Sequence, residues 1–172
     1  MHLYEGLESE AAAEGIIIDY TELKTTRALL LRDGDLEVIQ ICPSASYAER
    51  TSLLAEELGH HFTSVGNTVI HPDSITLSRS EERALRFAVD KLLPLNRVEE
   101  ALCKAPRSLH ELAEELGVSV DLLRHALAFW EATRGLYAEG DDCVLKFDPT
   151  GVYRTSDQDD FCHFLDGGEY AT

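Results

Sequence analysis

The chain has 172 residues, 44% of them hydrophobic, which is enough to bury the core of one domain with a small appendage and excludes disorder by composition. Its formal net charge of −17 repels phosphate groups, so non-specific binding to nucleic acid is disfavoured. Both high solubility and recognition of a basic protein partner are compatible with this charge.

The sequence pattern leads us to expect no membrane span and no signal peptide. Apolar runs such as residues 28 to 31 are too short to span a bilayer, and the first residues lack the basic and apolar regions of a signal peptide. The cysteines are widely spaced and form no C-x-x-C motif: Cys42, Cys103, Cys143 and Cys162. We therefore expect reduced thiols and a cytoplasmic protein.

The first part of the chain mixes helical and strand patterns. Residues 4 to 14 predict a helix, and residues 16 to 18 predict a short strand. Two further strands, at 27 to 32 and 35 to 41, flank Asp33-Gly34, which is a strong hairpin signal.

Two helices are predicted next. Ser44 or Ser46 can cap the first of them, which runs to about Val65. A loop rich in turn residues extends to about residue 77. The second helix fills 79 to 93 and ends before Pro94 because proline cannot continue it.

Helices also dominate the second part of the chain. Two or three of them are predicted between residues 95 and 134, with breaks at Pro106 and Gly117. Residues 136 to 138 and 143 to 147 predict a hairpin, and an acidic, loosely ordered tail is expected after it.

Residues 54 to 61, Leu-Ala-Glu-Glu-Leu-Gly-His-His, differ by one residue from the H-E-x-x-H signature of zinc proteases. Glu56 stands at the first histidine position, Glu57 at the position of the base and His60 at the second histidine position. Residues i and i+4 share a helix face, so Glu56 and His60 can hold one ion while Glu57, turned by about 100°, acts on water. The other possible pair, Glu57 with His61, offers metal binding without a base.

A third ligand is expected from the following helix. Glu81 falls near the middle of its apolar stripe and Glu82 at the edge. The stripe consists of Ala84, Leu85, Ala88, Val89 and Leu92. A carboxylate in an apolar face is costly unless it is paired or bound to metal, which favours Glu81 as the ligand. The alternative is a capping box, Ser78-x-x-Glu81, at the start of the helix.

Residues 48 to 67 and 81 to 95 resemble the ImmA/IrrE family of metallo-endopeptidases. Its members carry Leu-Ala-His-Glu-Leu-Gly-His, followed by a helix of the form Glu-x-x-Ala-x-x-Phe-Ala and Leu-Leu-x-Pro. The likeness is specific over residues 16 to 95, and onward to about 153 it resembles the phage and mobile-element branch. It implies an α+β fold, with a small zincin-like core of short antiparallel sheet, active-site helix and ligand helix, and a C-terminal helical extension.

The resemblance also implies a site with one zinc ion. The metal ligands would be Glu56, His60 and Glu81, and the catalytic residue would be Glu57. Possible auxiliary residues are His61, Glu82 and Tyr47. Glu56 departs from the family pattern, and its added negative charge would make a bound metal a weaker Lewis acid than a histidine ligand would.

The family resemblance implies a regulatory role. Such a protein cleaves or antagonises a basic helix-turn-helix repressor of a prophage or mobile element, and the alternative is a catalytically inactive zincin-fold module that binds or senses a partner. The implied organisation is a metallopeptidase core at 1–94, a helix-turn-helix-like extension at 95–135, a short hairpin at 136–153 and an acidic tail at 154–172.

Residues 108 to 130 follow the pattern of a helix-turn-helix, with a turn at Gly117. The second helix offers Arg124 and His125 beside the acidic Asp121, which is a poor surface for a DNA groove. Direct DNA binding is therefore a third hypothesis, behind a helical cap on the core or a surface for a protein partner.

Overall fold

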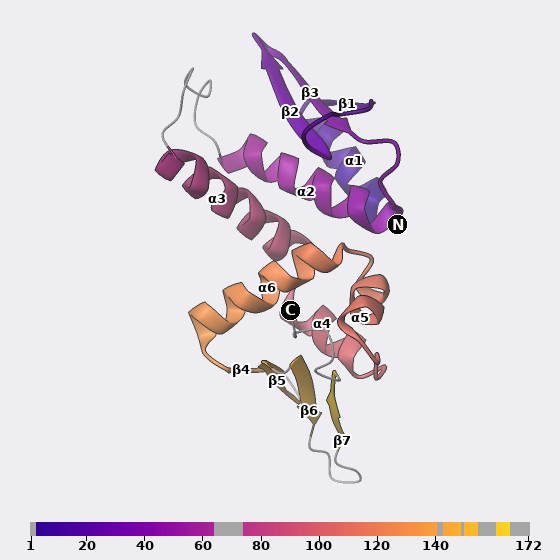
Figure 1. The fold of residues 1–172 in the computed structure, drawn as a ribbon, viewed down its shortest axis with the longest axis vertical. Coiled ribbons are helices and arrows are strands. Elements are labelled where there is room, and N and C mark those ends of the chain that lie inside the picture. Colours follow the sequence, from indigo (N-terminus) through magenta and orange to yellow (C-terminus); the bar gives the residue numbers. More distant parts are fainter. Residues whose placement is uncertain (1–2, 64–73, 141–142, 149, 155–160, 166–172) are drawn as a thin grey trace. The chain divides into compact units, whose positions relative to one another are not determined.

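The computed structural model describes residues 3–63, 74–140, 143–148, 150–154 and 161–165 (Figure 1). The chain divides into two compact units, Met1–Leu92 and Leu93–Thr172. Each unit contains helices and one sheet, so the predicted α+β class is confirmed. No helix in the described ranges combines the length and the apolar composition that crossing a membrane requires.

The first unit consists of a three-stranded sheet and three helices. Its elements are α1 (Leu3–Ala13), β1 (Ile17–Tyr20), β2 (Ala28–Asp33), β3 (Leu36–Ile41), α2 (Tyr47–Thr63) and α3 (Ser74–Leu92). The helix α2 contacts β2, β3 and α3, and lies between the sheet and α3 (Figure 1).

The sheet has the strand order β1-β3-β2, which makes β2 an edge strand. Strands β2 and β3 are antiparallel, but β1 runs parallel to β3, so the sheet is mixed and not purely antiparallel as expected. The hairpin turn contains Gly34 and Asp35, one residue later than the predicted Asp33-Gly34. Gly34 adopts a φ of +60°, which places the glycine at the first loop position, where a positive φ is needed.

Alternation along the strands separates two faces of this sheet. Ala28, Ile39 and Ile41 are buried on one face. The helix α2 contacts both β2 and β3, and its Leu54 and Leu58 are fully buried. This alternation gives the first unit its core and leaves the other face of the sheet to solvent.

The helix α2 begins with a capping box. The Ser46 hydroxyl accepts a hydrogen bond from the Glu49 N–H at 3.3 Å, and the Glu49 carboxylate accepts one from the Ser46 N–H at 2.7 Å. Ser46 is therefore the cap, not Ser44. The predicted end of α2 at Val65 lies outside the described residues.

The helix α3 begins at Ser74, five residues before the predicted start at 79. Most of the predicted loop between α2 and α3 lies outside the described residues. The predicted apolar stripe is confirmed for Ala84, Ala88, Val89 and Leu92, which are all buried, while Leu85 is only partly buried.

The second unit pairs three helices with a four-stranded sheet. Its elements are α4 (Leu95–Leu102), α5 (Leu109–Leu116), α6 (Val120–Arg134), β4 (Tyr137–Glu139), β5 (Cys143–Phe147), β6 (Thr150–Arg154) and β7 (Phe161–Phe164). The sheet is antiparallel throughout, in the order β4-β5-β6-β7.

The helix-turn-helix pattern of residues 108–130 is present in this unit. Ser108 caps α5, Gly117 ends it with a φ of +62°, and Ser119 caps α6. Both helices bury apolar side chains, among them Leu112, Leu123 and Trp130, so the unit has a core of its own.

The end of the chain differs from expectation. The expected hairpin of residues 136–138 and 143–147 is confirmed, since β4 pairs with β5. A loosely ordered tail was expected at 154–172, but residues 161–164 form β7, which pairs with β6. Residues 155–160 and 166–172 of this tail lie outside the described ranges. Val152 of β6 is buried along with Leu145 of β5, and so is Leu165, which follows β7, so these residues add to the core of the unit.

Candidate active site

Two of the predicted metal ligands meet between α2 and α3. The Nε2 atom of His60 lies 3.4 Å from a carboxylate oxygen of Glu81. Gly59 makes this approach possible, because a Cβ built at this position would lie 2.6 Å from the Ala84 carbonyl oxygen. The helices are thus closest one turn from Glu81, where neither has a bulky side chain.

Glu81 does not point into the apolar face as predicted. Its side chain is 61% exposed, whereas that of His60 is 21% exposed. The close contact between α2 and α3 is centred on Ala84. Glu81 lies one helical turn from Ala84, at the edge of this contact. The capping-box alternative is also wrong, because Ser78 lies inside α3 and not at its start.

Glu57 faces the sheet from α2. Burial raises the pKa of its carboxyl to about 7, the hydrogen bond from the Leu30 N–H of β2 lowers it, and the negative charge of Glu81 raises it. A carboxyl with a pKa near neutrality can both accept and release a proton, which is what a general base in hydrolysis must do.

Glu56 precedes His60 by one helical turn and is partly buried. Imidazole nitrogen and carboxylate oxygen suit zinc, and the separation of the His60 and Glu81 atoms is compatible with two ligands of one ion at about 2 Å each. Across the described ranges, however, no three His, Cys, Asp or Glu residues form a group that could hold a metal ion. The donor types therefore fit a metal and two of them meet, while Glu56 as third ligand stays a prediction.

His61 is tied to the sheet. Its Nδ1 lies 2.6 Å from the Glu37 carboxylate, and its Nε2 lies 3.7 Å from that of Glu14. Arg32 closes the network, since its guanidinium contacts Glu37 at 3.0 Å and the His61 carbonyl oxygen at 3.4 Å. An ionised carboxylate only accepts, so Nδ1 carries a proton. His61 thus fastens the last turn of α2 to the β2–β3 hairpin and does not pair with Glu57.

The balance of charges around Glu37 supports this network. Burial raises the pKa of Glu37, but the hydrogen bond from His61 and the positive charge of Arg32 outweigh it, and the pKa falls below its ordinary value. Glu37 is consequently ionised and able to hold both partners.

The other two auxiliary candidates lie apart from Glu57. Tyr47 is in the first turn of α2, about 20 Å along the helix axis from His60, and its hydroxyl accepts a hydrogen bond from the Tyr4 N–H at 3.4 Å. Glu82 is exposed on α3, turned by about 100° from Glu81.

Sequence reasoning missed Leu30, Arg32 and Glu37. Leu30 contributes a backbone N–H, for which a sequence carries no signal. Arg32 and Glu37 lie opposite each other on the buried face of the hairpin. Charged residues rarely occupy the strand positions that face a core. The presence of Arg32 and Glu37 at such positions was therefore a signal in the sequence for a polar contact with another element.

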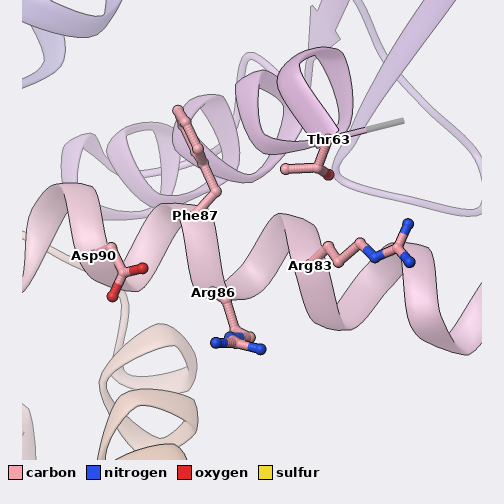
Figure 2. Close-up of a pocket in the computed structure, with 5 residues that line it drawn as sticks. All are labelled: Thr63, Arg83, Arg86, Phe87 and Asp90. Carbon is pink, nitrogen blue, oxygen red and sulfur yellow. The ribbon is translucent and has the colours of Figure 1, made fainter. Parts of the chain in front are cut away.

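A shallow hollow of about 280 Å³ lies on another flank of α3. Thr63, Arg83, Arg86, Phe87 and Asp90 line it (Figure 2). Figure 2 shows Phe87 pointing towards α2 while Arg86 points away from it, so the two arginines do not converge on one point. Arg83 and Arg86 are also on the side of α3 opposite to Glu81, and the hollow is separate from the His60–Glu81 pair.

Comparison with models of protein families gives a match that includes the candidate site. The model of the IrrE N-terminal-like domain family, Peptidase_M78, matches residues 11–128, which is more than half of the chain and includes α2 and α3. No curated protein matches the sequence.

Proposed function

Because the chain belongs to the family of IrrE N-terminal-like domains, we propose that it is a zinc-dependent endopeptidase-like regulator that cleaves or antagonises a helix-turn-helix repressor of a prophage or mobile element. The observation that carries the proposal is the His60–Glu81 pair at 3.4 Å, beside a Glu57 carboxyl whose pKa is about 7. The family supplies the metallopeptidase-like character, and the zinc and the repressor belong to the proposal.

In this proposal Glu56, His60 and Glu81 hold the metal ion. When bound, zinc supplies a Lewis acid that polarises the scissile carbonyl and lowers the pKa of water. Glu57 accepts the proton of the attacking water and passes it to the leaving amine. The Leu30 N–H holds the Glu57 carboxylate in place for this transfer.

The proposed partner has the opposite charge. A net charge of −17 favours a basic protein over an acidic one, and DNA-binding repressors are basic where they contact phosphate. This complementarity supports a repressor as the partner and disfavours DNA itself.

A second candidate function is a non-catalytic module with the same fold, which binds its partner without hydrolysis. Two observations favour it: Glu56 in place of a histidine, and no three-residue metal group among the residues that the structure describes.

Metal content and cleavage together separate these functions. We expect protein purified without chelator to carry about one equivalent of zinc, and Glu57→Gln to retain the metal while cleavage of the repressor falls by at least about 100-fold. The matched control is Glu115→Gln, since Glu115 occupies the same place in the second Leu-Ala-Glu-Glu-Leu-Gly at 112–117. If the protein carries less than about 0.1 equivalent of zinc and added zinc does not restore cleavage, the non-catalytic module is the function that remains. Unchanged cleavage by Glu57→Gln would remove Glu57 from its role.

A further inference from the structure

The solvent-facing side of the first sheet carries an apolar row across all three strands. Val38 of β3 is paired with Ile17 of β1 on one side and with Leu31 of β2 on the other, so these side chains lie next to one another. Leu29 and Leu36 extend the row on the same face. We call these five residues the apolar face.

The apolar face is not part of the core. Ile17, Leu29, Leu31 and Leu36 are 53%, 40%, 43% and 48% exposed, whereas Ala28, Ile39 and Ile41 on the opposite face of the sheet are buried. A sheet with one solvated face normally alternates apolar with polar residues, and a contiguous exposed apolar patch marks an interaction site. This sheet keeps the alternation of burial but carries apolar residues on both faces.

Acidic residues surround the apolar face. Asp19 lies on it beside Gln40, whose amide donates a hydrogen bond to the Asp19 carboxylate at 3.3 Å. Asp33 is paired with Leu36 on the same face, and Asp35 follows in the turn. Within the three described strands neither Lys nor Arg points to this side, because Arg32 is on the opposite face with Glu37.

This charge pattern selects the occupant. A second copy of the chain would bring the same aspartates against one another, with a net charge of −17 on each partner, and an anionic lipid surface would be repelled in the same way. A cationic segment with an apolar stripe gains both apolar burial and charge pairing at this surface.

The dimensions of the apolar face suit one helix. Neighbouring strands are about 4.8 Å apart, so β1 and β2 are separated by about 10 Å, which is the diameter of an α-helix. We propose that the apolar face is the docking site for a basic amphipathic helix of a partner protein. The inference rests on the proposed function for the existence of a protein partner, and adds the chemistry and the place of its docking segment.

The experiment uses the full chain with Glu57→Gln, which prevents cleavage during the measurement. The probe is a synthetic peptide of about 18 residues, with leucine at one helical stripe and lysine elsewhere. We expect its binding to shift the amide resonances of the apolar face in NMR spectra. A scrambled peptide of the same composition should bind at least about tenfold more weakly, since it offers charge without a stripe.

Variants locate the binding. Leu31→Gln should weaken binding of the amphipathic peptide at least about tenfold. Leu136→Gln, at a similarly exposed leucine of the second unit, should leave it unchanged. The double substitution Asp19→Asn with Asp33→Asn should weaken binding and reduce its dependence on salt, whereas Asp121→Asn with Glu114→Gln, at two exposed acids, removes the same charge without effect.

Three results would overturn the proposal: Leu31→Gln binding the peptide as tightly as the unsubstituted chain, resonance shifts confined to other surfaces, or a dimer that Leu31→Gln dissociates. The last would make the apolar face a self-interface. Failure of the proposed function can be distinguished from failure of the docking site. If the chain binds no zinc and cleaves no repressor but still binds the peptide, the proposed function is wrong and the docking site is retained.

Discussion

At the scale of single residues, Gly59 sets the distance between the two helices of the candidate site. Glycine to alanine in a helix normally stabilises by about 1 kcal/mol. At this position we expect the opposite, a loss of about 1–3 kcal/mol, because the new Cβ would lie 2.6 Å from the Ala84 carbonyl oxygen. Urea unfolding of Gly59→Ala measures the sign. A more stable variant would show that α2 and α3 are farther apart than described.

Glu56 can be tested by restoring the family residue. Glu56→His removes one negative charge from the site and adds an imidazole donor, so a bound metal becomes a stronger Lewis acid. We expect the rate of repressor cleavage to rise by at least about tenfold, as measured with a purified repressor. Glu56→Gln is the control, since it removes the charge without adding the imidazole. An equal rise in both variants would mean that charge alone limits the rate.

The sequence predicts some residues of the candidate site better than others. Helical spacing accounts for Glu57 and His60 on α2, whereas the expectation that Glu81 meets His60 rested on its place in the apolar stripe of the next helix and on the family resemblance. Helical spacing failed for the exposure of Glu81, because the crossing point of two helices depends on the contact of Gly59 with Ala84, which no single-helix pattern contains.

At the scale of elements, α2 depends on its first turn. Ser46→Ala removes the hydroxyl that accepts from the Glu49 N–H, and we expect a loss of about 1 kcal/mol in the free energy of unfolding. Pro43 precedes the same turn and offers a control at Pro43→Ala, where no capping hydrogen bond from a side chain is lost. Equal losses in the two variants would contradict the role of Ser46.

The same capping box makes the stability of α2 depend on pH. The hydrogen bond from the Ser46 N–H, opposed by burial and aided by the Ser46 hydroxyl and by Arg27, holds the pKa of Glu49 below its ordinary value of 4.5. A lowered pKa in the folded state contributes stability above pH 4.5, and this contribution is lost as the pH falls through the folded-state pKa. We expect Glu49→Gln to be less stable than the unsubstituted chain at pH 7, and the difference to shrink below pH 4.5. A difference independent of pH would rule out the charge.

Elements were predicted where turn chemistry marks their ends. Ser46 and Gly117 delimit helices in the sequence and in the structure. The strands β6 and β7 were not predicted, because both are short and β6 contains Gly151, a residue type that is depleted in strands. Only pairing in the finished sheet defines them.

At the scale of the whole molecule, each unit has its own core. Leu58 and Leu145 are buried in the first and second unit, respectively, and Trp130, the single tryptophan, is in the second. We expect Leu58→Ala and Leu145→Ala each to cost about 2–5 kcal/mol in their own unit. The midpoint of unfolding followed by tryptophan fluorescence should shift with Leu145→Ala and stay in place with Leu58→Ala. Equal shifts in both variants would show that the two units unfold as one.

The contact between Glu57 and Leu30 has a further consequence, which concerns solubility. The strand β2 is at the edge of its sheet, and edge strands with unpaired backbone groups promote aggregation. Here the Leu30 N–H is taken by Glu57, and the Ala28 carbonyl oxygen accepts a hydrogen bond from the Thr26 hydroxyl at 2.8 Å. The carboxylate expected to serve hydrolysis thus also blocks strand addition. Glu57→Ala would abolish hydrolysis and would also leave the Leu30 N–H at the edge of β2 without its acceptor. Glu57→Gln would abolish hydrolysis too, but it keeps an acceptor oxygen for the Leu30 N–H, so the edge of the sheet stays protected against strand addition.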